Sequence, residues 1–200
     1  MSFSEFARYF DTDIAQLWER QALCKARPVA GNLQLANKVM DYVRGVLGST
    51  YTQEVPQEIW DMRLTLQQGA ADLNLKRGAG GTVDIEFVVQ MLRLKFAPEH
   101  PQILVAGTLA AIDELETHSI LDTARAKFLR SSYQFLRSVE SRLRLMNTNT
   151  RHDLPTDEKQ LARLAYLMNF ESAEKLSQSV AQCRHNVRQL AIELFGAATL

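Results

Sequence analysis

The sequence predicts an all-α protein, a multi-helix bundle interrupted by a short extended glycine-rich loop near residues 72–82. Three observations predict this fold class. Apolar residues recur at spacings of three and four along most of the chain, as they do on one face of a helix. Proline and glycine fall between the periodic segments and mark their ends. Only residues 72–79 look extended, and this stretch is too short for a sheet.

Residue spacing predicts four helices in the first half of the chain, over residues 12–26, 33–47, 56–69 and 82–98. Proline and glycine suit these boundaries, because proline is tolerated at the first helical position and breaks a helix interior. The first two apolar stripes are Ile14, Leu17, Trp18, Ala22 and Cys24, then Leu33, Ala36, Met40, Val43 and Leu47. The third passes through Ile59, Trp60, Arg63 and Leu66.

The fourth of these helices follows the glycine-rich loop. Thr82 is a suitable N-cap, and Asp84 falls in the first turn, where an acid suits the helix dipole. Asp84 and Glu86 are two residues apart, so on a helix they diverge by roughly 200° and form no chelating pair. Two interpretations of the acids stay open. Asp84 stabilises the helix start and Glu86 makes an ion pair, or one of the two acids fixes Lys76 or Arg77 or faces a neighbouring active site.

The second half predicts a helix over residues 103–117, a long helix capped by Asp122, a short helix begun by Pro155, and a final helix. The long helix carries one apolar face, formed by Phe128, Phe135, Val139, Leu143 and Met146. The short helix passes through Leu161, Leu164 and Met168. The final helix alternates spacings of four and three, through Leu176, Val180, Cys183, Val187, Leu190 and Leu194, as in a helix packed in a bundle.

The composition of the chain limits the classes of function that it can have. The 200 residues are 46% hydrophobic and 23% charged with zero formal net charge, as in a globular protein with no global attraction to nucleic acid. No apolar run approaches the ~18 residues of a membrane span. The two lone cysteines, Cys24 and Cys183, predict a reduced, cytoplasmic setting. No linker or repeat is evident, so one helical domain over residues 1–200 is expected.

The glycine block LNLKRGAGGTVDIE, residues 73–86, stands out from the helical pattern. Lys76 and Arg77 run into Gly78, Gly80 and Gly81, and the block opens a helix. Backbone N–H groups at a helix start favour anions, so a phosphate-facing role is reasonable. The spacing matches neither G-x-x-x-x-G-K-[ST] nor G-x-G-x-x-G. Residue chemistry alone favours a structural turn over a ligand-binding or interface loop.

No catalytic centre is recognisable in the chain. The four histidines are dispersed without metal-ligand spacing, and both cysteines fall on apolar stripes. The ordered G-S-x(n)-D-x-D signature, the usual carrier of metal-binding carboxylates in nucleotidyltransferases, is missing. We therefore expect no catalytic residue and no metal ligand here. Lys25 and Arg27 form a basic cluster near the start, and residues 120–151 are also rich in arginine. For both basic stretches, a solvated surface is favoured over a binding face.

Three blocks resemble one family. WERQALCKARPVAGN, LNLKRGAGGTVDIEFVVQMLRLKF and FLRSVESRLRLMNTNTRHDLP, in this order over residues 18–155, are similar to the glutamine synthetase adenylyltransferases (glutamate–ammonia-ligase adenylyltransferase). That family has two similar halves, each a nucleotidyltransferase domain followed by a helical domain shared with PII uridylyltransferases. The first half tends to read GG-I-R-E-I-E-F, whereas this chain reads GGTVDIEF. The resemblance implies the helical domain of the second half, which adenylylates glutamine synthetase.

The resemblance also implies what this fragment of a larger enzyme contributes. ATP and magnesium belong to the adjacent nucleotidyltransferase domain, and no cofactor is expected in the fragment itself. Glutamine synthetase and the PII regulatory protein are the implied partners, with neither nucleic acid nor membrane. The residues that match the motifs, expected near the nucleotide or the domain interface, are Lys25, Arg27, Lys76, Arg77, Gly80, Gly81, Asp84 and Glu86. The alternative is a helical interaction or regulatory module without nucleotide chemistry.

Overall fold

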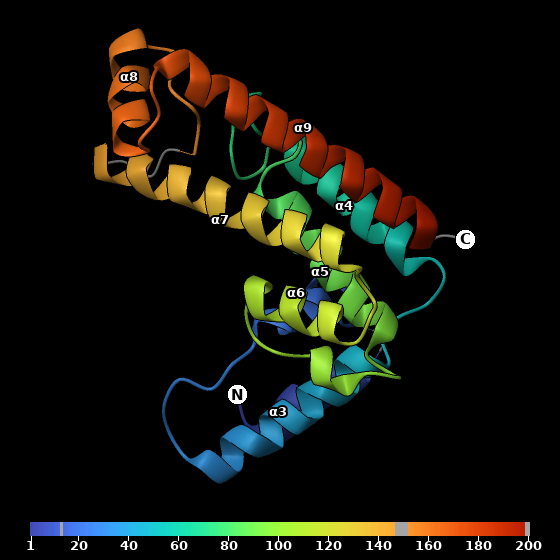
Figure 1. The fold of residues 1–200 in the computed structure, drawn as a ribbon. Helices are drawn as coiled ribbons and strands as arrows, with labels where there is room; N and C mark the ends of the chain where they lie inside the picture. The colour runs from blue at the N-terminus through green and yellow to red at the C-terminus, as the bar shows by residue number, and fades with distance from the viewer. Residues whose placement is uncertain (13, 147–151, 199–200) are drawn as a thin grey trace. The chain divides into compact units, whose positions relative to one another are not determined.

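The computed structural model describes residues 1–12, 14–146 and 152–198, and within these ranges it confirms the all-α fold class. The α-helices there are α1 (Phe3–Asp11), α2 (Leu17–Ala22), α3 (Leu33–Gly48), α4 (Val55–Gln68), α5 (Thr82–Phe96), α6 (Thr108–Thr117), α7 (Thr123–Met146), α8 (Glu158–Leu167) and α9 (Ala173–Ala198) (Figure 1). Two short 3-10 helices, Leu23–Lys25 and Pro101–Ile103, complete the helical structure. No β-strand forms in the described residues. One antiparallel bridge pairs Asn74 with Asp153, inside the loop expected to be extended.

The chain divides into two compact units, described separately here. The first contains residues 1–59 and 89–126, and the second contains residues 60–88 and 127–198. Helices α4, α5 and α7 each contribute residues to both units. The single domain expected over residues 1–200 stays a prediction. No helix in the described part of the chain is long and apolar enough to cross a membrane.

In the first unit, α1 packs against α3. Phe10, Ala15 and Val46 form a buried cluster, and the partly buried rings of Tyr9 and Tyr42 pack on it. Helix α1 was not among the expected helices. It begins at a capping box in which Ser2 and Glu5 bond each other's backbone N–H groups, and a reciprocal cap of this kind stabilises a short helix.

The helix expected over residues 12–26 was wrong in extent and in its buried face. Among the described residues of this range, only Leu17–Ala22 is α-helical, and a 3-10 turn follows it. Of the two cysteines, Cys24 is buried and Cys183 is half-buried. Ile14 and Trp18, expected on the apolar stripe, are 66% and 57% exposed. Leu33 is likewise exposed at the start of α3. A periodic stripe shows which residues share a helix face, and the packing of neighbouring elements decides whether that face is covered.

In the second unit, α9 packs as the final helix was expected to pack. Leu176, Val180 and Val187 are buried, whereas Cys183 and Leu190 are half-buried. Helix α9 runs alongside α4 (Figure 1), and the ring centroids of Trp60 and Phe195 lie 5.0 Å apart. Helix α8 packs on the beginning of α9. The second unit also holds the glycine block, which the α9 side chains contact.

Candidate functional site

The glycine block folds back on itself and closes the start of α5. The N–H groups of Thr82 and Val83 donate to the carbonyls of Leu75 and Lys76, at 3.0 and 3.1 Å. The Gly81 N–H donates to the Gly78 carbonyl at 3.0 Å. These N–H groups are the orphan donors of a helix start. The loop supplies their acceptors itself, as expected for the structural turn that residue chemistry favours.

Asn74 organises the basic side of the loop. Its side-chain oxygen accepts the backbone N–H groups of Lys76 at 3.1 Å and of Arg77 at 2.7 Å. Its side-chain nitrogen donates to Asp153 at 2.7 Å. The Leu75 N–H donates to the His152 carbonyl at 2.7 Å. One asparagine therefore fixes the direction in which both cationic residues leave the loop, a local role suited to its short polar side chain.

Asp84 is the centre of a buried charge cluster. Its side chain is fully buried and forms an ion pair with Arg63, which is also fully buried. Arg188 of α9 approaches the same carboxylate at 3.2 Å, and the Gly80 N–H donates to it at 2.7 Å. Burial lowers the pKa of Arg63, and the negative charge of Asp84 opposes that shift. Asp84 therefore holds α4, α9 and the glycine turn together.

Arg184 of α9 holds the outside of the same turn. Its Nε donates to the Ala79 carbonyl at 3.1 Å, and one of its terminal nitrogens donates to the Asp72 carbonyl at 2.7 Å. Gly80 has φ +69°, and a Cβ there would overlap the Arg184 backbone. A Cβ on Gly81 would lie 2.6 Å from the Leu75 carbonyl oxygen. Both glycines are therefore required by close backbone approach, as the structural interpretation of the block predicts.

The two acids of the block diverge, as the helix geometry predicted. Glu86 lies half-buried and accepts a hydrogen bond from the Tyr133 hydroxyl of α7 at 3.2 Å. The ion pairs of Asp84 are with Arg63 and Arg188. Of the two interpretations left open, the stabilising one therefore applies to Asp84.

Lys76 and Arg77 line a hollow of about 240 Å³. The remaining lining residues are Gly69, Ala70, Ala71, Asn74, His152 and Asp153. His152 Nδ1 lies 2.9 Å from Glu140, a buried acid of α7 that Arg137 also contacts at 2.9 Å. The hollow thus presents two cationic side chains and one exposed carboxylate on a tightly braced loop.

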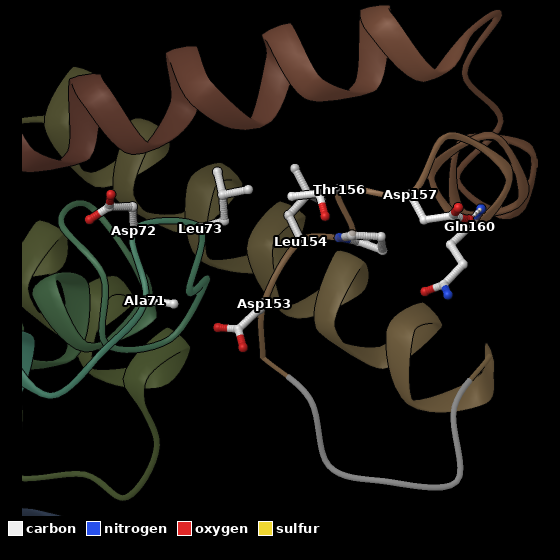
Figure 2. Close-up of a pocket in the computed structure, with 9 residues that line it drawn as sticks. Ala71, Asp72, Leu73, Asp153, Leu154, Thr156, Asp157 and Gln160 are labelled. Carbon is white, nitrogen blue, oxygen red and sulfur yellow. Dashed lines mark hydrogen bonds between the residues drawn. The ribbon is translucent and has the colours of Figure 1, made fainter.

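A second, larger hollow of about 580 Å³ adjoins the same loop (Figure 2). Figure 2 shows Asp72 and Leu73 on one segment, Asp153 and Thr156 on the other, and Gln160 at the start of α8. Its charged lining residues are all acidic. Within the described residues no group of histidine, cysteine or acid side chains has the geometry to hold a metal ion.

The expected site residues fall in both units. Lys76, Arg77, Gly80, Gly81 and Asp84 come together in the glycine block of the second unit, with Glu86 half a turn further along α5. The other two expected residues, Lys25 and Arg27, are exposed and belong to the first unit. Part of the basic stretch over residues 120–151, including Arg151, lies outside the described residues.

Sequence reasoning missed the arginines that brace the block. Arg63 was recognised only as a member of an apolar stripe, yet a charged residue on such a stripe is itself a signal of a buried ion pair. Arg184 and Arg188 lie one turn apart on α9, among the residues of its apolar seam. Their acceptors are more than 100 positions away in sequence, so no local pattern pairs them with the block.

Residues 60–195 match the family described as GlnD PII-uridylyltransferase. The chain is also similar to curated proteins named bifunctional glutamine synthetase adenylyltransferase/adenylyl-removing enzyme. The one from Rhizobium meliloti (strain 1021) is 28% identical over 96% of this chain and 20% of its own length. Those from Bradyrhizobium sp. (strain ORS 278) and Methylococcus capsulatus are 30% and 29% identical, over 88% and 97% of this chain. The chain spans about a fifth of the length of these relatives.

Proposed function

Because this chain belongs to the GlnD PII-uridylyltransferase family, we propose that it is the helical, non-catalytic part of a larger enzyme that adenylylates and deadenylylates glutamine synthetase. Its role is to support an adjacent nucleotidyltransferase domain. The coverage of about a fifth of each relative supports a fragment of a longer protein. The ordered G-S-x(n)-D-x-D carboxylate signature is missing from the sequence, which favours a structural role over a catalytic one.

The observation that carries this proposal is the contrast between the braced turn and the cations of Lys76 and Arg77, which have no acidic partner among the described residues. Asp84 and Arg63 fix the backbone of the block from the inside, and Arg184 fixes it from the outside. Lys76 and Arg77 donate to no acceptor from their side chains within the described residues. Cations held on a rigid loop lose little entropy when they meet a negatively charged group, which suits a wall that faces nucleotide chemistry.

We assign the chain to the adenylylating, C-terminal half of such an enzyme on the sequence Gly80–Phe87. Carboxylates of the neighbouring domain would then hold magnesium beside the bound ATP, and the metal would neutralise the charge that develops during nucleotidyl transfer. Glutamine synthetase is the substrate, the PII protein is a regulatory partner, and the setting is cytoplasmic. The two cations contribute positive charge near the transferred group.

The kinetics of adenylyl transfer in the full-length enzyme test this proposal. Lys76→Ala and Arg77→Ala, made separately, should each lower kcat/KM for AMP incorporation into glutamine synthetase about tenfold or more, since a charged hydrogen bond contributes about 1.5–3 kcal/mol. Lys175→Ala, an exposed lysine of α9, is the matched control and should leave the rate unchanged. Parental rates in both block variants, with unchanged unfolding, would reject the catalytic-wall role.

The alternative is a helical interaction module with no part in nucleotide chemistry. For such a module, the Lys76→Ala and Arg77→Ala variants should affect partner binding and not nucleotide chemistry. The same two variants would then weaken the binding of a partner protein and leave adenylyl transfer to a saturating concentration of glutamine synthetase unaltered. Measuring KM and kcat separately distinguishes the two, because lost partner binding raises KM alone.

A further inference from the structure

Lys76 and Arg77 differ from the other basic residues around the glycine block. Arg63, Arg184 and Arg188 each donate to a carboxylate or a carbonyl. In the part of the chain that the structure describes, the ammonium group of Lys76 and the guanidinium group of Arg77 have no such acceptor. Both residues nevertheless line the same hollow of about 240 Å³. Two unpaired cations at one concave surface leave a local excess of positive charge.

The backbone that carries these cations is fixed before any ligand arrives. Asn74 accepts both of their backbone N–H groups, and its own side chain is bonded to Asp153. The segment opposite is fixed as well, because Leu75 and His152 share a backbone hydrogen bond and His152 contacts the buried Glu140. Hydrogen bonds within the chain therefore hold the lining in place, and among the described residues the cationic groups of Lys76 and Arg77 bond to no acceptor.

The size and charge of the hollow select the class of ligand. Pockets that enclose a drug-sized molecule occupy about 300–1,000 Å³, so 240 Å³ suits a small anion or the end of a larger molecule. Guanidinium groups match the geometry of a phosphate in a fork of parallel hydrogen bonds, and an ammonium adds a point charge. The Asp153 carboxylate can accept a hydrogen bond from the hydroxyl of a protonated phosphate but repels anions that carry no proton.

We propose that the hollow lined by Lys76, Arg77, Asn74 and His152 binds a phosphate group, either as free phosphate or as the terminal phosphate of a phosphomonoester. Lys76 and Arg77 donate to the phosphate oxygens. Asp153 limits the affinity through its negative charge. This inference rests on the geometry of the second unit alone and holds whether or not the chain serves an adenylyltransferase.

Titration calorimetry on the full chain at low ionic strength tests the proposal, with inorganic phosphate and phenyl phosphate as separate probes. We expect saturable binding that added sodium chloride weakens, because exposed charges are screened by salt. Lys76→Ala and Arg77→Ala should each weaken it about tenfold. Lys175→Ala, the same change at an exposed position of α9, should have no effect.

Asp153→Asn supplies a gain-of-affinity test. An asparagine there keeps an oxygen to accept the Asn74 side-chain N–H and removes one negative charge from the lining, so both probes should bind more tightly. Equal binding of the two probes would identify the phosphate group as the whole ligand, and binding of phosphate alone would identify the free anion. No saturable binding at tens of millimolar, or parental affinity in both cation variants, would overturn the proposal.

Discussion

Replacing Asp84 by asparagine should be among the most destabilising single changes in the second unit. The side chain keeps its shape and can still accept one hydrogen bond, so the change removes the charge and little else. Arg63, which has no exposed side-chain surface, would then carry a buried positive charge opposite a neutral partner. Arg188 is only 16% exposed and would lose the same carboxylate. Leaving a buried charge uncompensated costs about 3–5 kcal/mol.

That loss is large beside the ~5–15 kcal/mol that holds a typical domain folded. Urea unfolding followed by circular dichroism would measure it as a lower transition midpoint. Asp122→Asn is the matched control, because its carboxylate is 52% exposed and pairs with Arg125 at 3.2 Å. Exposed pairs contribute about 0–1 kcal/mol, so the control should change little.

A second variant separates the buried charge from other causes. Arg63→Met in the Asp84→Asn background removes the uncompensated charge and keeps most of the volume, so it should recover part of the lost stability. The reasoning would be refuted if Asp84→Asn unfolds within about 0.5 kcal/mol of the parent, the range of ordinary surface substitutions. It would also be refuted if the double variant were less stable than Asp84→Asn alone.

Three further changes test other parts of the account. Val187→Asp, at a position 1% exposed, should cost about 3–5 kcal/mol, whereas Gln189→Asp on the exposed face of α9 should be nearly neutral in the same unfolding assay. Gly80→Ala should lower the thermal midpoint, because Gly80 has φ +69° and lies against the α9 backbone. Gly45→Ala, at an open helical position, should raise the midpoint by up to a few degrees. Equal midpoints for the two variants would contradict the close approach of Gly80 to α9. Burial and a neighbouring carboxylate raise the pKa of Tyr42 from 10.0 to about 12. The stability that its protonated hydroxyl contributes is therefore present below pH 10 and lost as pH rises through 12, and an absorbance titration should show a phenol that titrates near 12 and that Tyr42→Phe removes.

The parts of the fold that sequence predicts well are those governed by local periodicity. The apolar spacing of α9 continues over many turns, and Leu176, Val180 and Val187 are buried as expected. Short helices gave a weaker signal. Helix α1 has only nine residues, although its capping box of Ser2 and Glu5 was visible in the sequence. Exposure of Trp18 depends on which neighbours cover α2, and no pattern within the helix contains that information.

In the candidate site, too, local features could be predicted from the sequence and tertiary contacts could not. The glycine block was recognisable because three glycines beside two cations are unusual in a helical chain, and their close packing followed from that composition. The partner of Asp84 on α9, Arg188, is 104 residues away. Such a pairing is set by tertiary packing rather than by spacing, so the sequence indicated a buried role for neither residue. The hollow beside Lys76 likewise depends on the return of the chain at His152.

The central claim is that this chain is a helical, non-catalytic part of an adenylyltransferase, and one measurement addresses it directly. The isolated 200-residue chain and the full-length enzyme are incubated side by side with glutamine synthetase, magnesium and ATP labelled in its α-phosphate, and labelled AMP on glutamine synthetase is followed with time. The account predicts rapid incorporation by the full-length enzyme and none above background by the chain alone, because the sequence lacks the G-S-x(n)-D-x-D carboxylate signature. Sustained incorporation by the chain alone at an enzyme-like rate would contradict the claim.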